Sequence, residues 1–204
     1  MIAIIDYGAG NLRSVQKACE YIGADAIITS DKDKIKSAQR VILPGVGAFG
    51  DCMESIREHN LFDTIHQVCE SGTPFLGICL GLQLLFEASE ETPGVEGLGI
   101  FKGKNVKIPK KEGLKIPHMG WNSLTFTKDS PLFKDIPDES FVYFVHSYYM
   151  KPEDKSIISA TCNYSEELPV ALSKNNIHAV QFHPEKSGET GLKMLSNFIN
   201  GGGF

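Results

Sequence analysis

A cysteine stands between two glycines where a strand-like pattern gives way to a helix-like one, in the segment Gly77-Ile78-Cys79-Leu80-Gly81. A tight strand-to-helix turn brings neighbouring backbone close, so glycine fits on either side of a strained central residue. Such a turn would hold the Cys79 sulfur at a helix N-terminus, whose partial positive charge favours thiolate over thiol. The segment alone is equally compatible with a buried, inert cysteine that packs as a small hydrophobe.

A second segment, Gln181-Phe182-His183-Pro184-Glu185, supplies the residue types that a cysteine nucleophile needs. A thiol requires a base to take its proton, and the base requires a third group that fixes its tautomer and orientation. A histidine at a strand end is usually just a surface or structural residue. Because His183 and Glu185 follow an apolar run in a chain that also carries the cysteine turn, we predict a catalytic triad of Cys79, His183 and Glu185.

The elements that must position these residues follow from hydrophobic periodicity. In the first half, four apolar runs of strand length alternate with helix-length segments, which predicts a parallel sheet with helices on both faces. The expected strands are 1–5, 26–29, 41–43 and 75–78, and the expected helices are 11–23, a short one from 30 or 31, one or two from a cap at Asp51 to Glu70, and 80–88.

The second half has mostly strand patterns joined by turns and ends in a helix. We expect strands at 106–108, 123–127, 141–145, 157–162, 170–173 and 178–182, and a last helix at 192–199. These strands extend the sheet and add an antiparallel portion. With no repeat or linker, residues 1–204 are predicted to form one α/β domain with a mixed, mostly parallel central sheet.

Composition excludes several classes of protein. The 204 residues are 42% hydrophobic and carry 25 acidic against 20 basic side chains, a net charge of -5 that argues against nucleic-acid binding. The uncharged run from Ser71 to Phe86 is shorter than the roughly 20 apolar residues of a membrane span, and the N-terminus lacks the features of a signal peptide. Five cysteines without a CxxC pair favour a reducing cytoplasm over disulfides or a zinc site.

Cofactors are not expected. Gly8-Ala9-Gly10 follows the first strand, but Arg13 stands where a dinucleotide-binding loop has its third glycine. No His, Cys or carboxylate set has the spacing of a metal site.

The segments 77–83 and 181–185 together resemble those of the class I (triad) glutamine amidotransferases, and the likeness runs from the first strand to the last helix. Four further segments and Lys186-Ser187 are similar to the glutaminase-subunit family of imidazole glycerol phosphate synthases. These four are 6–14 (DYGAGNLRS), 44–49 (PGVGAF), 117–122 (PHMGWN) and 143–149 (YFVHSYY). Anthranilate-type glutaminases differ, because they usually have serine directly after the glutamate and PGPG in place of PGVG.

The resemblance also implies roles for residues outside the triad. The glycine-rich turn after the third strand is otherwise an ordinary strand-end turn, but its backbone N–H groups would suit an oxyanion hole. Gln83 lies one helical turn after Cys79, on the side of the helix that would face a substrate. The implied oxyanion hole is Val46 or Gly47 with Leu80, the implied substrate pocket is Gln83, His146, Ser147 and Tyr148, and the implied partner surface holds Asn11, Trp121 and Asn122.

The family likeness implies hydrolysis of L-glutamine to glutamate and ammonia. The ammonia would pass, within a heterodimer, to a (β/α)₈-barrel cyclase subunit that makes imidazole glycerol phosphate and an aminoimidazole carboxamide ribotide for histidine biosynthesis. Three alternatives remain open: a glutaminase that serves another synthase, such as the anthranilate type, a cysteine hydrolase on the same fold, and a non-enzymatic binding module. We also expect the isolated chain to be a poor glutaminase that the partner and its ligand activate.

Overall fold

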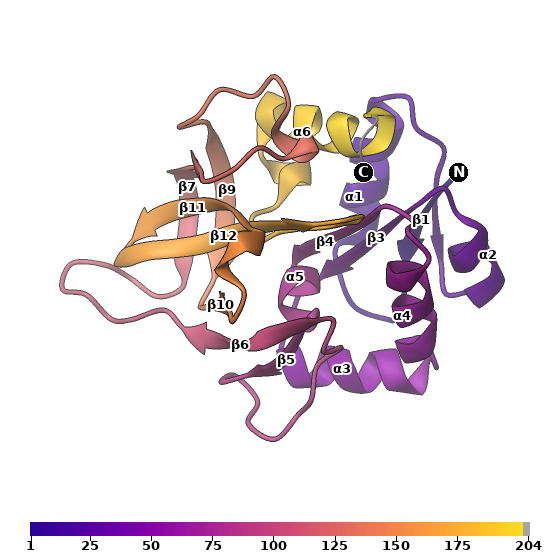
Figure 1. Ribbon diagram of the computed structural model, residues 1–204, viewed down its shortest axis with the longest axis horizontal. Helices are drawn as coiled ribbons and strands as arrows, with labels where there is room; N and C mark the ends of the chain where they lie inside the picture. Colours follow the sequence, from indigo (N-terminus) through magenta and orange to yellow (C-terminus); the bar gives the residue numbers. More distant parts are fainter. Residues whose placement is uncertain (202–204) are drawn as a thin grey trace.

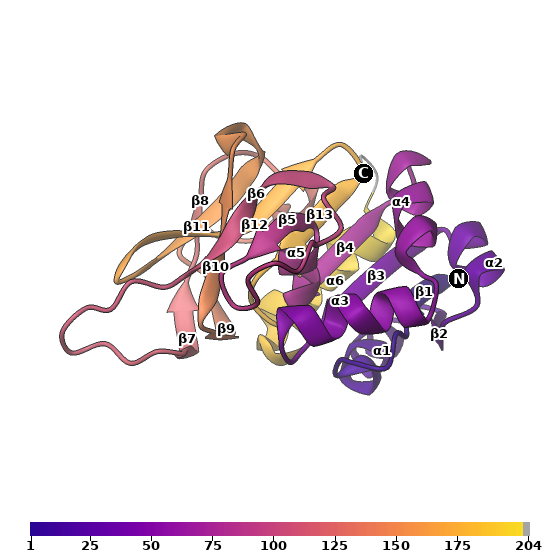
Figure 2. The same ribbon diagram turned by 90° about the horizontal axis from the view of Figure 1, so that it is seen from below.

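The computed structural model describes residues 1–201, so the last three residues of the predicted domain lie outside the described part. An eight-stranded sheet forms the centre, with parallel strands from β2 to β13 and antiparallel ones from β12 to β8 (Figures 1 and 2). Its strands, in spatial order, are β2 (Ala26–Thr29), β1 (Ile2–Ile5), β3 (Arg40–Gly45), β4 (Phe75–Cys79), β13 (Ile177–Val180), β12 (Glu166–Lys174), β11 (Ile158–Tyr164) and β8 (Thr125–Phe126). The predicted mixed sheet is confirmed.

Helices cover both faces of the sheet, as the alternation of strands and helices predicted. Along β1, Ile2 and Ile4 belong to the core on one face, and Ala3 and Ile5 to the core on the other. The first face is covered by α1 (Leu12–Tyr21) and α6 (Gly188–Asn200), and the second by α2 (Lys32–Ser37), α3 (Phe49–Glu58) and α4 (Phe62–Glu70) (Figures 1 and 2).

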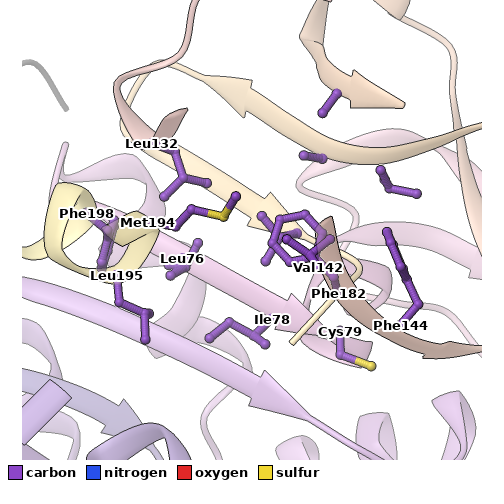
Figure 3. Packing of buried hydrophobic residues seen from close by; sticks show 14 of the residues in the cluster. Leu76, Ile78, Cys79, Leu132, Val142, Phe144, Phe182, Met194, Leu195 and Phe198 are labelled. Atoms are coloured by element: carbon purple, nitrogen blue, oxygen red, sulfur yellow. The ribbon is translucent and has the colours of Figure 1, made fainter. Parts of the chain in front are cut away.

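The core on the α6 face reaches the end of β4. Figure 3 shows side chains of α6 packed over Leu76 and Ile78, with Cys79 at the tip of the strand. The rings of Phe144 and Phe182 meet edge to face, with centroids 5.7 Å apart, and complete this end of the cluster. Buried packing on this scale holds the strand rigidly up to Cys79.

Two small sheets lie beside the central one. In the first, β6 (Phe101–Lys107) pairs with β5 (Phe86–Ser89) and β10 (Tyr148–Pro152), and in the second β7 (His118–Ser123) pairs with β9 (Phe141–His146). The remaining elements are α5 (Leu80–Leu84) and three 3₁₀ turns, η1 (Pro131–Phe133), η2 (Lys155–Ile157) and η3 (Pro184–Lys186). No helix within residues 1–201 combines the length and the apolar character that crossing a bilayer requires.

Several predicted boundaries were wrong. The helix expected over 80–88 ends at Leu84, because Phe86–Ser89 pairs as a strand with β6. The strand expected to stop before Pro44 continues to Gly45, since pairing with β4 persists after pairing with β1 has ended at Ile42. The strand expected over 123–127 is divided at Leu124, which is buried and bonds through its backbone to residues 139 and 140.

The helix cap expected at Asp51 was also wrong. α3 begins earlier, with Ala48 at its N-cap, and Asp51 lies in the first turn. The first backbone N–H groups of α3 bond to side chains of a distant loop. Phe49 N donates to Glu91 Oε2 at 2.8 Å, and Gly50 N donates to Thr92 Oγ1 at 3.2 Å. Side chains from more than forty residues away replace the local cap that the sequence suggested.

Candidate active site

Cys79 occupies a strained turn between β4 and α5. Its backbone angles are φ +56° and ψ -112°, a conformation that side-chain-bearing residues rarely adopt. Gly81 explains why the turn is possible, because a Cβ there would lie 1.9 Å from the carbonyl oxygen of Leu43 in β3. The close approach of β3 to the turn therefore requires glycine at position 81, and it brings the strand that precedes Val46 and Gly47 alongside Cys79.

His183 and Glu185 follow β13, the strand next to β4 in the sheet. His183 Nδ1 lies 2.8 Å from Glu185 Oε1, and both side chains are buried. Because a carboxylate can only accept, Nδ1 carries the proton and donates it, which leaves Nε2 as the basic nitrogen. Nε2 is buried and forms no hydrogen bond of ordinary geometry, so it is the nitrogen available for proton exchange.

The environment of His183 favours its protonated form. Burial by itself lowers the pKa of His183, but the Cys79 sulfur and the Glu185 carboxylate together outweigh burial and raise that pKa to about 9. A histidine that holds a proton above neutral pH beside a cysteine is the partner expected for a thiolate.

The backbone of His183 is tied to β9 through Tyr143 and Ser187, two residues outside the predicted triad. His183 N donates to Tyr143 O at 3.0 Å. Ser187 Oγ donates to His183 O at 2.6 Å and accepts from Tyr143 N at 3.0 Å. These bonds fix the turn that carries His183.

A cavity of about 310 Å³ opens beside the cysteine. It brings together Cys79, His183 and all seven residues predicted for the oxyanion hole and the substrate pocket, together with three that were not predicted: Glu91, Pro117 and Val145. Glu185 lies behind His183 and does not line it. Glu91 escaped prediction because nothing in the sequence distinguishes it from its neighbour Glu90, whereas the structure brings Glu91 both to the cavity and, through its carboxylate, to the start of α3.

The glycine-rich turn forms one wall of this cavity. Gly45 is in register with Cys79 across β3 and β4, so the turn begins level with the Cys79 thiol. Gly47 has φ +105°, and a Cβ added there would meet nothing within 4 Å. The positive φ, rather than a lack of space for a side chain, is therefore what favours glycine at this position.

Gln83 lines the cavity, but its amide already has protein partners. Gln83 Nε2 donates to Gln181 Oε1 at 2.9 Å and to Tyr148 O at 3.2 Å. Gln181, which is fully buried, in turn places Nε2 3.8 Å from Cys79 Sγ. Gln181 was not predicted to have a role, although an amide beside the apolar residues Ala179, Val180 and Phe182 is the one signal in the sequence that could have pointed to it.

His146 connects the cavity wall to β7. Its Nδ1 lies 2.9 Å from Tyr148 O, and its Nε2 lies 2.9 Å from His118 Nδ1. Burial lowers the pKa of His146 to about 3 and that of His118 to about 4, so both rings are neutral at pH 7. His118 Nε2 lies 3.4 Å from Asn122 Nδ2, which links the pocket to the segment predicted as a partner surface.

The residues predicted for the partner surface do not share one environment. Trp121 is 56% exposed and flanked on the β7 and β9 sheet by exposed Met119 and Phe141, a small apolar surface. Asn122 is half-buried and donates to Asn163 O at 3.1 Å. Asn11 lies in a separate depression at the start of α1. Within residues 1–201 no cluster of His, Cys, Asp and Glu has an arrangement that could hold a metal.

Comparison with known proteins places the chain in a family. A model of the glutamine amidotransferase class-I family matches residues 3–201. A Caldanaerobacter subterraneus subsp. tengcongensis protein named imidazole glycerol phosphate synthase subunit HisH is 55% identical over 198 residues, covering 97% of both chains. The Methanococcus maripaludis protein named imidazole glycerol phosphate synthase subunit HisH 1 is 50% identical over 202 residues, covering 98% of both.

Solved structures support the fold. In the structure of PurLQS from Thermotoga maritima, one chain superposes with a TM-score of 0.78 at 20% identity, covering 98% of this chain and 97% of that one. This likeness establishes the architecture alone. From the family match and the close relatives together, the chain belongs to the class I glutamine amidotransferases and, within them, to the HisH glutaminase subunits of imidazole glycerol phosphate synthase.

Proposed function

We propose that Cys79, His183 and Glu185 hydrolyse L-glutamine to glutamate and ammonia, and that the ammonia passes to a (β/α)₈-barrel cyclase subunit. The observation that carries the proposal is the meeting of the strained Cys79 and the Glu185-bound His183 in one cavity. Family membership supplies the substrate class, and the relatives named as subunits of a synthase support a partner. The free, buried cysteines support the predicted reducing cytoplasm.

The first half of the reaction forms an acyl-enzyme. Cys79 thiolate attacks the side-chain carboxamide carbon of glutamine, and the negative charge that develops on oxygen is held by backbone N–H groups of Leu80 and of Val46 or Gly47. Protonated His183 gives the proton on Nε2 to the leaving nitrogen. The C–N bond then breaks to release ammonia, leaving a glutamyl thioester on Cys79.

The second half regenerates the enzyme. Neutral His183 takes a proton from water through Nε2 while the water oxygen attacks the thioester carbonyl. The C–S bond breaks, glutamate is released, and the sulfur leaves as thiolate beside protonated His183. Glu185 keeps Nδ1 protonated throughout and stabilises the imidazolium, which is why a His183 pKa near 9 suits the resting ion pair.

The cavity also suits the amino-acid end of glutamine. Its volume of about 310 Å³ is at the small end of ligand pockets, as a single amino acid requires. Glu91 contributes a carboxylate to the lining, and that negative charge would favour the α-ammonium group. Ser147 and Tyr148 also line the cavity, and hydrogen bonds from them to the amino-acid end of glutamine would complete such a site.

The decisive experiment measures glutamate and ammonia release by the wild-type complex and by the complex carrying Cys79→Ala. We expect the variant to lose glutamine-dependent activity and to retain product formation from added ammonium, since that route bypasses Cys79. Normal glutamine turnover by Cys79→Ala would overturn the triad assignment. A cysteine hydrolase of another class would release no ammonia from free glutamine, and an anthranilate-type subunit would be activated by a different synthase.

A further inference from the structure

The orientation of two buried amides near Cys79 follows from a single backbone carbonyl. Gln83 contacts Tyr148 O, an atom that can only accept, so the Gln83 atom at 3.2 Å must be the donor Nε2. Were the Gln83 amide turned over, two oxygens would face each other. Gln83 is 4% exposed, so no bulk solvent would compensate for that contact.

The same reasoning passes from Gln83 to Gln181. Gln83 Nε2 has a second hydrogen and lies 2.9 Å from the Gln181 amide, whose facing atom must therefore be the acceptor Oε1. The other end of the Gln181 amide, Nε2, then points its N–H groups toward Cys79 Sγ at 3.8 Å. The bonds from Gln83 to Tyr148 O and to Gln181 Oε1 together therefore determine that the Gln181 N–H groups face the Cys79 sulfur.

The Tyr148 carbonyl, which orients both amides, accepts a second hydrogen bond. Tyr148 O also lies 2.9 Å from His146 Nδ1, which must donate because the carbonyl cannot. Asn105 Nδ2 fixes the backbone of Gln83 by donating to its carbonyl at 2.9 Å. The amide of Gln181 therefore approaches the sulfur from a rigid, desolvated support, which is the arrangement that makes a hydrogen bond to a charged group effective.

We propose that Gln181 is a further catalytic residue, whose side-chain amide, oriented through Gln83 by the Tyr148 carbonyl, donates a hydrogen bond to the Cys79 sulfur as thiolate. The inference rests on the proposed function in taking Cys79 as the nucleophile. Unlike His183, an amide donor gives up no proton in either half-reaction. Gln181 thus remains a donor toward the sulfur throughout the cycle, including the moment at which the C–S bond breaks and sulfur departs with the electron pair.

The test is the pH dependence of Cys79 alkylation by iodoacetamide, measured on the full chain without glutamine. Gln181→Met keeps the length of the side chain and removes the donor. We expect it to raise the midpoint of the alkylation profile by about one pH unit, which is about tenfold slower reaction below the midpoint. The midpoint belongs to the coupled Cys79–His183 pair, so only its change is interpreted. Reaction of the other cysteines is subtracted with Cys79→Ala.

Two further variants separate a role in stabilising thiolate from a role in packing. Asn197→Leu removes a buried amide that donates to the carbonyls of Leu132 and Lys134 and takes no part in orienting Gln83 or Gln181, so it should lower thermal stability without moving the midpoint. Gln83→Met removes the group that orients Gln181 and should move the midpoint in the same direction. The double variant Gln83→Met/Gln181→Met should shift it no further than Gln181→Met alone.

An unchanged midpoint in folded Gln181→Met, or an equal shift in Asn197→Leu, would overturn the inference. If Gln181→Met does not fold, the Gln83→Met profile decides in its place. Failure of the proposed function has a different signature, since glutamate release by the complex would then survive complete alkylation of Cys79.

Discussion

The carbonyl oxygen of Tyr143 accepts a hydrogen bond from the backbone N–H of His183 at 3.0 Å. Tyr143 is also the register partner of Trp121 across β7 and β9, and the two rings meet edge to face with centroids 6.0 Å apart. Strand β9 thus bonds through Tyr143 to the backbone of His183, the proposed base, and pairs with Trp121 at the centre of the exposed apolar surface. A partner that contacts Trp121 would act on a strand directly attached to His183.

Replacing Trp121 tests whether this surface binds the partner. Because the side chain is 56% exposed, Trp121→Ala should change the free energy of unfolding by less than about 1 kcal/mol while weakening assembly with the cyclase subunit by about 1–2 kcal/mol. Calorimetric titration measures the assembly. Tyr21→Ala, at an aromatic residue that is 79% exposed on α1, is the matched control and should leave affinity unchanged. Lost stability with unchanged affinity would contradict an interface role.

Acid should destabilise the fold through His118. The folded-state pKa of His118 is about 4, below the value of roughly 6.5 in an unfolded chain. Between these values the unfolded state binds more protons, so stability rises with pH and is lost as pH falls toward 4. Each such histidine contributes a slope of up to about 1.4 kcal/mol per pH unit. Urea unfolding from pH 4 to 7 should give a smaller slope for His118→Gln, and equal slopes would show that the ring is charged in the fold.

Alkali should act in the opposite direction through His183. Its folded-state pKa of about 9 lies above the unfolded value, so its contribution to stability is fully present below about pH 6.5. That contribution is lost as pH rises through 9. The fall in the free energy of unfolding between pH 7 and 9 should be shallower in His183→Ala, and an unchanged profile would argue against an imidazolium at the resting site.

Gly81→Ala tests the close approach of β3 to the cysteine turn. Alanine normally stabilises a helix relative to glycine by about 1 kcal/mol, but a Cβ at this position would overlap Leu43 O. We expect a loss of about 3–5 kcal/mol in the free energy of unfolding, as for severe core substitutions. Gly23→Ala, where a Cβ meets nothing within 4 Å and only the positive φ is unfavourable, is the control. Comparable losses in the two variants would contradict the steric explanation.

Gly47→Val tests whether rotation at the oxyanion turn controls activity. A β-branched residue disfavours the φ of +105° and the alternatives that glycine reaches easily, so the variant should lose stimulation by the partner's ligand while still binding glutamine. An absent oxyanion donor costs about 10²–10³ in turnover. Glutamate release is compared for the chain alone, with the cyclase subunit, and with the subunit and its ligand. Equal wild-type rates in all three conditions would refute gating.

The cysteine turn was predictable because its requirements are local. Gly77 and Gly81 bracket Cys79 within five residues, and the apolar run before them indicates a buried strand. His183 and Glu185 were likewise recognisable, since a proline between them fixes their relative placement. The four strands predicted for the first half are present in the expected order for the same reason: each is a short, mostly apolar run bounded by turn residues.

Features that depend on distant contacts were not predictable. Glu91 and Thr92 cap α3 in place of Asp51, and nothing near residue 49 reveals them. The short length of α5 reflects pairing between β5 and β6, which overrides the helical pattern of residues 85–88. The contacts of Gln181 could not be predicted because its partners, Gln83 and Cys79, lie about one hundred residues away in the sequence. The function of a buried amide depends on which groups it bonds to, and these are known only from the fold.

The position of β13 between β4 and β12 has a consequence for how the protein folds during its synthesis on the ribosome. The chain is made from the N-terminus, so the strand bearing Cys79 leaves the ribosome about one hundred residues before the segment that provides His183. Until β13 enters the sheet, β4 is an open edge and the thiol has no base beside it. Completion of the central sheet and assembly of the triad are therefore the same late event, and the nascent chain carries a cysteine that cannot yet consume glutamine.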